Sequence, residues 1–258
     1  MTTALITGAS NGIGLELAKI HASKGGNLVL VARNKSKLDE LKNELEEQFN
    51  ISVYTIGKDL SELNSAQEVY NETKKQNIQV DYLINNAGFG GFGMLDETEW
   101  NKELQMINLN ITTLTLFTKL YVQDMVKRRS GKIMNVASTA AFQPGPTMAV
   151  YCATKSYVLS FTEALSNEVS DKGITITALC PGATETGFQA AGGLDESELF
   201  KGKKLPRAKD VAEYGYRAMM NGRTVAIHGF MNYILSSSVS FMPRNLVVKV
   251  ARKMLDKK

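Results

Sequence analysis

A tyrosine and a lysine stand four residues apart in this chain, at Tyr151 and Lys155, and Ser138 precedes them at the end of an apolar run. On a helix, a separation of four places two side chains on the same face. An ammonium beside a phenol favours the phenolate, so we expect the pKa of Tyr151 to lie below its usual value of about 10. Such a tyrosine can donate and accept a proton near neutral pH, and the Ser138 hydroxyl can hold a substrate carbonyl oxygen.

A glycine-rich segment near the start of the chain predicts a phosphate-binding turn. Residues 7–14 read TGASNGIG, and they lie between the apolar run 4–6 and a helical pattern that begins at Leu15. The glycines let the backbone turn tightly and approach a pyrophosphate, while the first turn of a helix offers unpaired N–H groups. This order of strand, glycine turn and helix predicts a dinucleotide site. For the motif alone, a glycine turn without a ligand remains the alternative.

Seven short apolar runs are the strand candidates, and they alternate with longer amphipathic stretches. The runs cover residues 4–6, 28–31, 53–56, 82–84, 133–136, 174–179 and 225–227, while residues 38–49 and 100–126 have helical periodicity. This alternation predicts an α/β fold, a single-domain Rossmann-type doubly wound sheet of about seven parallel strands with helices on both faces. No linker or repeat divides residues 1–258, so we expect a single NAD(P)-binding domain.

Further motifs follow one another in an order that is specific as a set. The chain carries Asp59-Leu60, Asn85-Asn86-Ala87-Gly88, Asn108, and Pro181-Gly182 followed by Thr184 and Thr186. With the glycine turn, Ser138, Tyr151 and Lys155, these motifs make the chain similar to the classical short-chain dehydrogenase/reductase family over nearly its whole length. One position departs from the family pattern, because Ile111 stands three residues after Asn108, where the family often has glycine.

The resemblance implies a catalytic set. Tyr151 would be the general acid/base, and Lys155 would hold the nicotinamide ribose and lower the tyrosine pKa. Ser138 would orient the reacting oxygen, and Asn108 would support a water relay to Lys155. Cofactor-binding residues expected from the glycine turn and the resemblance are Gly8, Ser10, Asn11, Gly12, Ile13, Gly14, Asp59, Leu60, Asn86, Ala87, Gly88, Tyr151, Lys155, Pro181, Gly182, Thr184 and Thr186. The resemblance also implies a homodimer or homotetramer, paired through helices over residues 100–129 and 150–171.

The charge after the second strand candidate predicts which cofactor is bound. An enzyme that selects NAD usually places an acidic residue there, about 20 residues after the glycines. This chain has Arg33 at that place, followed by Asn34, and no acid until Asp39. A guanidinium can pair with a 2′-phosphate, so we expect NADP(H), with Ser10, Asn11 and Asn34 adding hydrogen bonds. The alternative is that Arg33 stacks on adenine and accepts either cofactor.

Three segments are expected to line the substrate pocket: residues 89–94, 140–148 and 188–205. They are rich in Phe, Met and Gly, and they predict an apolar ketone or aldehyde as substrate, held near Ser138, Phe89, Phe92, Phe142 and Phe188. The loop at about 187–206 is expected to close over the substrate and exclude water. Its lysines are interpreted as solvated, with contact to a phosphate or coenzyme A tail as the alternative.

Cysteine and histidine are sparse, so we expect no metal site. Cys152 and Cys180 lack metal-ligand spacing, and the only histidines are His21 and His228. Cys152 is interpreted as a small apolar filler and not as a redox-sensitive thiol. The first strand candidate begins too early for a signal peptide, and no apolar run reaches the about 18 residues that span a bilayer, so a cytoplasmic location is expected.

The net charge of +4 arises near the C-terminus. Residues 244–258 carry six cations and one anion, Asp256. A basic body that would bind nucleic acid is therefore not expected. Apolar residues at helical spacing predict a basic amphipathic helix at about 243–258, whose favoured role is to pack on its own domain. Contact with an anionic membrane or with the active site of a neighbouring subunit remains the alternative.

These features together predict an NADP(H)-dependent oxidoreductase that works in the reductive direction on a small-molecule carbonyl or alcohol. NAD-dependent alcohol oxidation by the same residues is one alternative. The other is a dinucleotide-sensing scaffold that keeps the fold without the chemistry. The presence of Asn108, Ser138, Tyr151 and Lys155 together favours the enzyme.

Overall fold

Seven parallel strands form one sheet in the computed structural model, which describes residues 1–188 and 205–255. The strands are β1 (Thr3–Thr7), β2 (Asn27–Ala32), β3 (Val53–Gly57), β4 (Tyr82–Asn85), β5 (Gly131–Val136), β6 (Ile174–Cys180) and β7 (Val225–Ile227). They contain every predicted apolar run, which confirms the predicted doubly wound α/β fold.

The order of the strands creates a crevice at one edge of the sheet. That order is β3-β2-β1-β4-β5-β6-β7, so the chain winds one way from β1 and the other way from β4. Ala4 of β1 pairs with Leu28 of β2 on one side and with Tyr82 of β4 on the other. Ligands of open α/β sheets bind where the winding reverses, outside the carboxyl ends of the strands.

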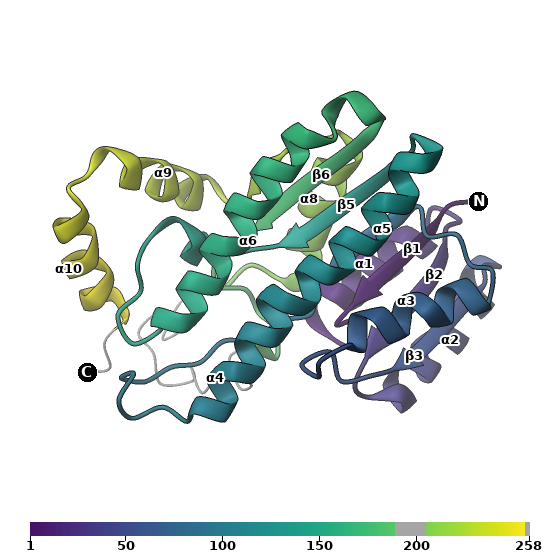
Figure 1. Cartoon of the computed structure of the whole chain (residues 1–258), viewed down its shortest axis with the longest axis horizontal. Coiled ribbons are helices and arrows are strands. Elements are labelled where there is room, and N and C mark those ends of the chain that lie inside the picture. The colour runs from purple at the N-terminus through teal and green to yellow at the C-terminus, as the bar shows by residue number, and fades with distance from the viewer. Residues whose placement is uncertain (189–204, 256–258) are drawn as a thin grey trace.

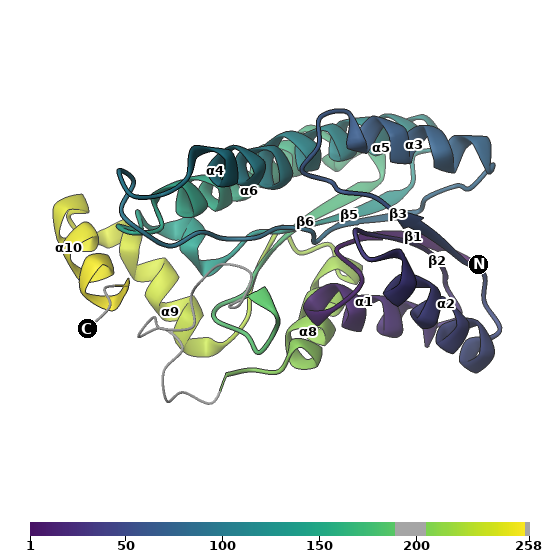
Figure 2. The ribbon, with the colours of Figure 1, turned by 90° about the horizontal axis from the view of Figure 1, so that it is seen from below.

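Helices cover both faces of the sheet (Figures 1 and 2). One face carries α1 (Gly12–Ala22), α2 (Lys35–Phe49) and α8 (Ala208–Met220), and the other carries α3 (Ser65–Lys75), α4 (Trp100–Ile107), α5 (Leu114–Arg128) and α6 (Ala149–Glu168). A hydrophobic core lies on each face of the sheet, and successive residues of β1 pack into opposite cores. Ile6 lies in the same core cluster as Leu17, whereas Leu5 lies in the same cluster as Phe117. Burial on both faces explains why the strands read as continuous apolar runs.

The helix predicted over residues 100–129 is not one uninterrupted α-helix. A π-helical turn, Asn108–Thr113, joins α4 to α5. The second predicted helix, at 150–171, is α6 followed by a 3-10 turn at Ser170–Lys172. Further 3-10 turns lie at Thr139–Phe142 and Val239–Phe241. A π turn widens the backbone spiral and changes which side chains face inward, and such turns often occur at functional sites.

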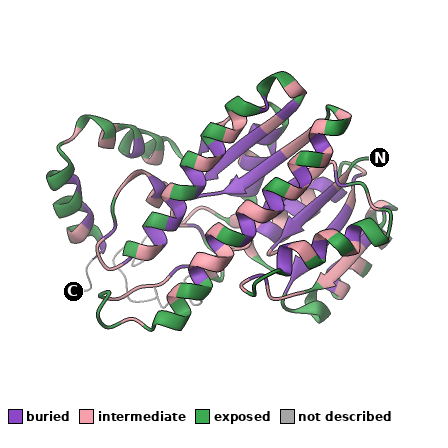
Figure 3. Cartoon of the chain, viewed as in Figure 1, coloured by how far each residue is buried: buried purple, intermediate pink, exposed green. Residues whose placement is uncertain are grey.

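The chain ends in two helices, α9 (Phe230–Ser238) and α10 (Arg244–Leu255), which lie at one end of the molecule (Figure 1). Val247, Ala251 and Leu255 of α10 are buried against the body, as the favoured interpretation predicted. Most of α9 is exposed (Figure 3). The proposed substrate loop at about 187–206 falls mainly outside the described residues, as do residues 256–258. Within the described part of the chain, no helix is long and apolar enough to cross a membrane.

Candidate active site

A cavity of about 900 Å³ lies at the carboxyl ends of the strands. Its walls come from the loops that follow β1 to β6 and from residues of α6 and α10. All the residues predicted to bind a cofactor line this cavity, with the exception of Gly14. The volume lies in the range of small-molecule and cofactor sites.

The glycine turn after β1 leaves the start of α1 open to a ligand. Gly8 and Gly12 have φ angles of +67° and +55°, which side chains rarely adopt. Asn11, at the N-cap, makes no side-chain cap hydrogen bond within the described chain. The first N–H groups of α1 therefore remain available to an anion, and the helix dipole favours a negative charge there.

Gly14 contributes by close packing and not by lining the cavity. A Cβ atom at this position would lie 2.4 Å from the Gly8 oxygen and 2.5 Å from Asn86 Nδ2. Asn86 Nδ2 in turn donates to the Thr7 oxygen at 2.9 Å, and the backbone N–H groups of Asn86 and Ala87 donate to Thr7 Oγ1. The loop after β4 thus holds the glycine turn in place.

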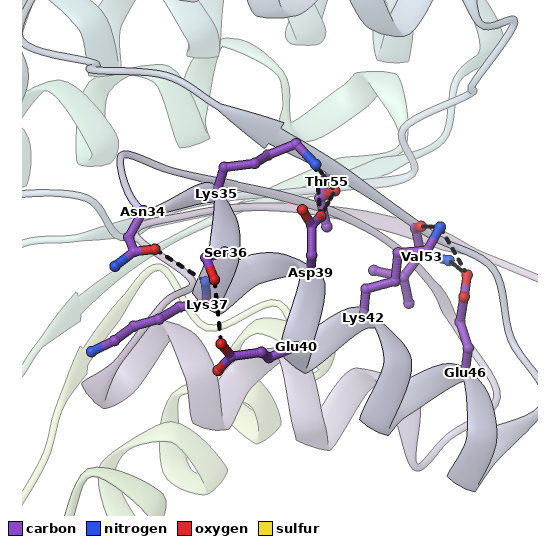
Figure 4. A network of polar contacts seen from close by, with 10 residues as sticks. All are labelled: Asn34, Lys35, Ser36, Lys37, Asp39, Glu40, Lys42, Glu46, Val53 and Thr55. Carbon is purple, nitrogen blue, oxygen red and sulfur yellow. Dashed lines mark hydrogen bonds and ion pairs between the residues drawn. The ribbon is translucent and has the colours of Figure 1, made fainter.

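Besides Lys58, two further cations line the far end of the cavity, at Arg33 and Lys37. Within the described chain neither of them forms an ion pair, whereas Lys35 is held by Asp39 at 2.6 Å. Figure 4 shows Lys37 extending away from that pair, while Asn34 Oδ1 accepts a hydrogen bond from the Lys37 N–H and caps α2. The sequence analysis missed Lys37, although a lysine in the first turn after Arg33 was the available signal.

The Arg33 charge also acts on Asp59 across this end of the cavity. Burial raises the pKa of the Asp59 carboxyl, but hydrogen bonds from Ser61 and the charges of Arg33 and Lys58 outweigh burial, so the pKa lies below its ordinary value. Lys58 is itself paired with Glu68 at 2.6 Å. Asp59 is therefore an anion held among cations, and Arg33 and Lys37 are the groups left to receive a phosphate.

Tyr151 and Lys155 lie in the first half of α6, buried at the inner end of the cavity. Lys155 Nζ is 5.8 Å from the centre of the Tyr151 ring, which confirms that the two share one face. Lys155 Nζ also donates a hydrogen bond to the Val136 oxygen at 2.8 Å. The serine, tyrosine and lysine that the sequence singled out meet at this point.

The expected lowering of the Tyr151 pKa is wrong for this structure. Burial raises the pKa of the phenol, and a hydrogen bond with Ser138 opposes that rise only in part. Burial also lowers the pKa of Lys155 to about 8, so its cationic form is itself disfavoured. Desolvation disfavours both the Tyr151 phenolate and the Lys155 ammonium, and this outweighs the effect of the lysine charge that the helical spacing predicted.

Ser138 follows β5 and points its hydroxyl into the cavity. Ser138 Oγ accepts a hydrogen bond from the Ala140 N–H at 3.1 Å, which fixes the start of the 3-10 turn. The Ser138 hydroxyl lies 3.5 Å from the Pro181 oxygen. A hydroxyl held beside a phenol in this way is suited to orient a carbonyl oxygen between them.

The structure brings Asn110, and not the predicted Asn108, to the site. Asn108 is half-buried and makes no side-chain hydrogen bond within the described chain, and neither asparagine lines the cavity directly. Asn110 is 1% exposed, and its Nδ2 donates to the Phe89 oxygen at 3.0 Å and to Thr154 Oγ1 at 3.1 Å. The π turn places it there, two residues further along than the resemblance assigned.

Gly88 shows how close Asn110 lies to the reacting groups. A Cβ atom on Gly88 would be 3.0 Å from Asn110 Oδ1 and 3.4 Å from Lys155 Nζ. Both polar atoms therefore border the same small space beside the Gly88 backbone. The position three residues after Asn110 is Thr113, whose hydroxyl donates to the Leu60 oxygen at 2.8 Å. Ile111 is thus not the position to compare with the family's glycine.

The substrate end of the cavity is largely apolar. Phe89, Ser138 and Phe188 line it as predicted, together with Met148 from the predicted segment 140–148. Leu255 also lines it and was not predicted. Leu255 comes from α10, and only the fold shows that this helix reaches the cavity. A polar rim from the start of α4 includes Asn101, Lys102 and Gln105.

Two of the predicted substrate residues lie elsewhere. Phe142 lines a separate shallow hollow beside Pro144 and Arg244. Phe92 packs against the apolar cluster of Met106 and Tyr151 but does not line the cavity. The prediction that Phe92 and Phe142 line the substrate end of the cavity is therefore wrong. The sequence shows which loop an aromatic residue belongs to, but not where its ring points.

The remaining titratable side chains have structural surroundings. His21 is buried, and its Nδ1 lies 2.9 Å from the Tyr216 hydroxyl. Cys152 is buried too, and burial raises the pKa of its thiol to about 11, which agrees with an apolar filler. Among residues 1–188 and 205–255, no three His, Cys, Asp or Glu side chains are grouped so that they could hold a metal ion.

The chain is similar in sequence to known oxidoreductases over most of its length. A family model described as short chain dehydrogenase matches residues 2–196. The chain is 32% identical over 234 residues to the NADP-dependent 3-hydroxy acid dehydrogenase of Schizosaccharomyces pombe, covering 87% of this chain and 89% of that protein. It is 28% identical over 254 residues to the very-long-chain 3-oxoacyl-CoA reductase of Homo sapiens, covering 96% and 78%.

A solved structure resembles the fold closely. The short-chain dehydrogenase from Sphingobium yanoikuyae in complex with NADPH superposes with a TM-score of 0.84 at 29% identity. The match covers 93% of this chain and 94% of that chain.

Proposed function

Because the chain belongs to the short-chain dehydrogenase family, we propose that it is an NADP(H)-dependent oxidoreductase that reduces an apolar ketone or aldehyde. The observation that carries the proposal is the meeting of Ser138, Tyr151 and Lys155 at the inner end of a cavity whose outer end is the glycine turn. A dinucleotide is long enough to join these two ends, and the turn is built to receive its pyrophosphate.

The cavity residues fit such a cofactor. The uncapped start of α1 would hold the pyrophosphate, and Arg33 with Lys37 would hold a 2′-phosphate. Asp59 and Leu60 would border the adenine, and the segment from Pro181 to Thr186 would border the carboxamide. When bound, the nicotinamide supplies or accepts the hydride.

Tyr151 moves the proton in the proposed reaction. Its phenol donates to the carbonyl oxygen as that oxygen gains charge, and Ser138 holds the same oxygen in place. A phenol whose pKa is raised by burial remains protonated at neutral pH, as the reductive direction requires. Lys155 binds the ribose and supplies the nearby positive charge when it is protonated.

Asn110 takes over the role first assigned to Asn108. It fixes the loop at Phe89 and borders the space beside Lys155, so it is placed to hold water that returns a proton toward Tyr151. The apolar wall of Phe89, Met148 and Leu255 favours a substrate with a hydrophobic body, which agrees with the very-long-chain acyl substrate in the name of the human relative.

The test is turnover of NADPH with a panel of apolar ketones, aldehydes and 3-oxoacyl thioesters, for the wild type and for Tyr151→Phe. We expect substrate-dependent oxidation of NADPH by the wild type. Tyr151→Phe should bind NADPH as tightly and lose turnover by at least about a hundredfold, because general acid catalysis contributes that much. Unchanged turnover in this variant would contradict the proposal.

A further inference from the structure

Helix α9 has its apolar side chains on the outside. Asn232 and Ser236, one turn apart, face the body, and Asn232 Nδ2 donates to the His228 oxygen at 2.8 Å. Phe230 is 78% exposed, and Met231, Tyr233, Ile234 and Leu235 are also exposed. A surface helix of a globular protein normally has the opposite arrangement, with its apolar stripe inward.

This arrangement has a packing cause. A Cβ atom on Gly182 would lie 2.5 Å from Asn232 Nδ2, so α9 sits directly on the backbone of the loop after β6. Only small or polar side chains fit between the helix and that loop. The large apolar side chains of α9 are therefore exposed, and Figure 3 shows most of this helix in the colour of exposed residues.

Exposed apolar residues also follow α9 along the chain. Phe241 is 88% exposed, and Leu246, Val250 and Met254 form a second row on α10, beside the buried row of Val247, Ala251 and Leu255. Exposed apolar surface that continues over two helices usually marks an interaction site. We call this surface the docking face: Phe230, Met231, Ile234, Leu235, Phe241, Leu246, Val250 and Met254.

Lysines border the docking face. Lys249 and Lys253 lie one turn apart on α10, are exposed, and form no ion pair within the described chain. Residues 229–255 contain no Asp or Glu, and residues 229–243 contain no charged residue at all. The surface therefore combines an uncharged apolar part on α9 with a purely basic border on α10.

We propose that the docking face binds an anionic lipid surface. The apolar side chains of α9 would enter the boundary between headgroups and acyl chains, and Lys249 and Lys253 would lie at the phosphate level. Charge favours lipid over a second copy of the chain, because a twofold pairing of this face would bring two acid-free basic borders together. The oligomer expected by resemblance uses α4 to α6, on another part of the molecule.

The proposal is tested by flotation of the full chain with vesicles. One set is phosphatidylcholine alone, and the other contains about 30% phosphatidylglycerol. We expect partition into the anionic vesicles at low salt, at least about tenfold weaker partition into phosphatidylcholine, and a decrease at high salt. Light scattering without vesicles records the oligomeric state in parallel.

Two double variants separate the apolar and the basic contributions. Phe230→Ser with Ile234→Ser should weaken partition into anionic vesicles at least about tenfold, and its matched control is Leu63→Ser with Met220→Ser, exposed apolar residues outside the docking face. Lys249→Glu with Lys253→Glu should also weaken it at least about tenfold, and its control is Lys24→Glu with Lys75→Glu, exposed lysines outside the docking face. Both controls should bind like the wild type.

Three outcomes would overturn the proposal: no flotation of the wild type, equal flotation with both vesicle sets, or weakening by the controls as strong as by the variants. A change in oligomeric state on replacing Phe230 and Ile234, without any vesicle binding, would assign the face to a second copy. Because the readout is binding, the result does not depend on the proposed enzymatic activity.

Discussion

Replacing Asn110 by alanine should destabilise the protein, and the structure gives the size of the effect. The Asn110 amide is 1% exposed and makes two donor hydrogen bonds, to the Phe89 oxygen and to Thr154 Oγ1. Its removal leaves the half-buried Phe89 carbonyl and the buried Thr154 hydroxyl without this donor. At about 1–3 kcal/mol for each buried group left unsatisfied, we expect a loss of about 2–4 kcal/mol in the free energy of unfolding.

The assay is urea and thermal unfolding of Asn110→Ala beside Asn108→Ala as the matched control. For a chain of this size the expected loss lowers the Tm by roughly 5–15 °C. Asn108→Ala should change stability by no more than about 0.5 kcal/mol, because its side chain is half-exposed without hydrogen bonds in the described chain. NADPH turnover should fall in Asn110→Ala alone. If Asn108→Ala were the destabilised and inactive variant, our assignment of the asparagine would be refuted.

Three further predictions concern the cofactor end and the buried lysine. Arg33→Asp should weaken NADPH binding by about 10–100-fold and leave NADH binding within a fewfold, measured by fluorescence titration, because one charged hydrogen-bonding group is lost and a repulsive one is gained. Gly14→Ala should cost about 1–3 kcal/mol in urea unfolding and weaken both cofactors, because its Cβ would meet the Gly8 oxygen at 2.4 Å; wild-type stability would contradict the packing argument. The Lys155 pKa of about 8 lies below the ordinary 10.5, so between these values the unfolded chain binds more protons. Wild-type stability should therefore gain about 2 kcal/mol over Lys155→Met as pH rises from about 8 to about 10, and a constant difference would show that the lysine is not buried as a cation.

The sheet was predictable because the inner strands are buried on both faces. Runs such as residues 28–31 and 174–179 consist of Leu, Val, Ile, Thr and Ala, and long amphipathic helices separate the strands. The cavity was predictable as well, since the motif residues follow successive strands, and the carboxyl ends of parallel strands meet at one edge. The confirmed juxtaposition of Tyr151 and Lys155 needed only helical spacing.

Local backbone geometry and burial account for what the sequence did not predict. The π turn at Asn108–Thr113 breaks the regular helical spacing, so a sequence pattern cannot tell which of two nearby asparagines faces inward. The raised pKa of Tyr151 depends on how much protein surrounds it, which spacing does not measure. Leu255 reaches the cavity from far along the chain, and no local signal predicts such a contact.

The most direct test of the account is titration of the purified protein with NADPH and, separately, with NADH, followed by nicotinamide fluorescence, and then addition of apolar ketones and aldehydes to the tighter complex. We expect NADPH to bind at least about tenfold more tightly, since Arg33 and Lys37 line the end of the cavity where we propose that the 2′-phosphate binds. We also expect it to be oxidised when a substrate is added. Failure to bind either dinucleotide would contradict the account at its centre.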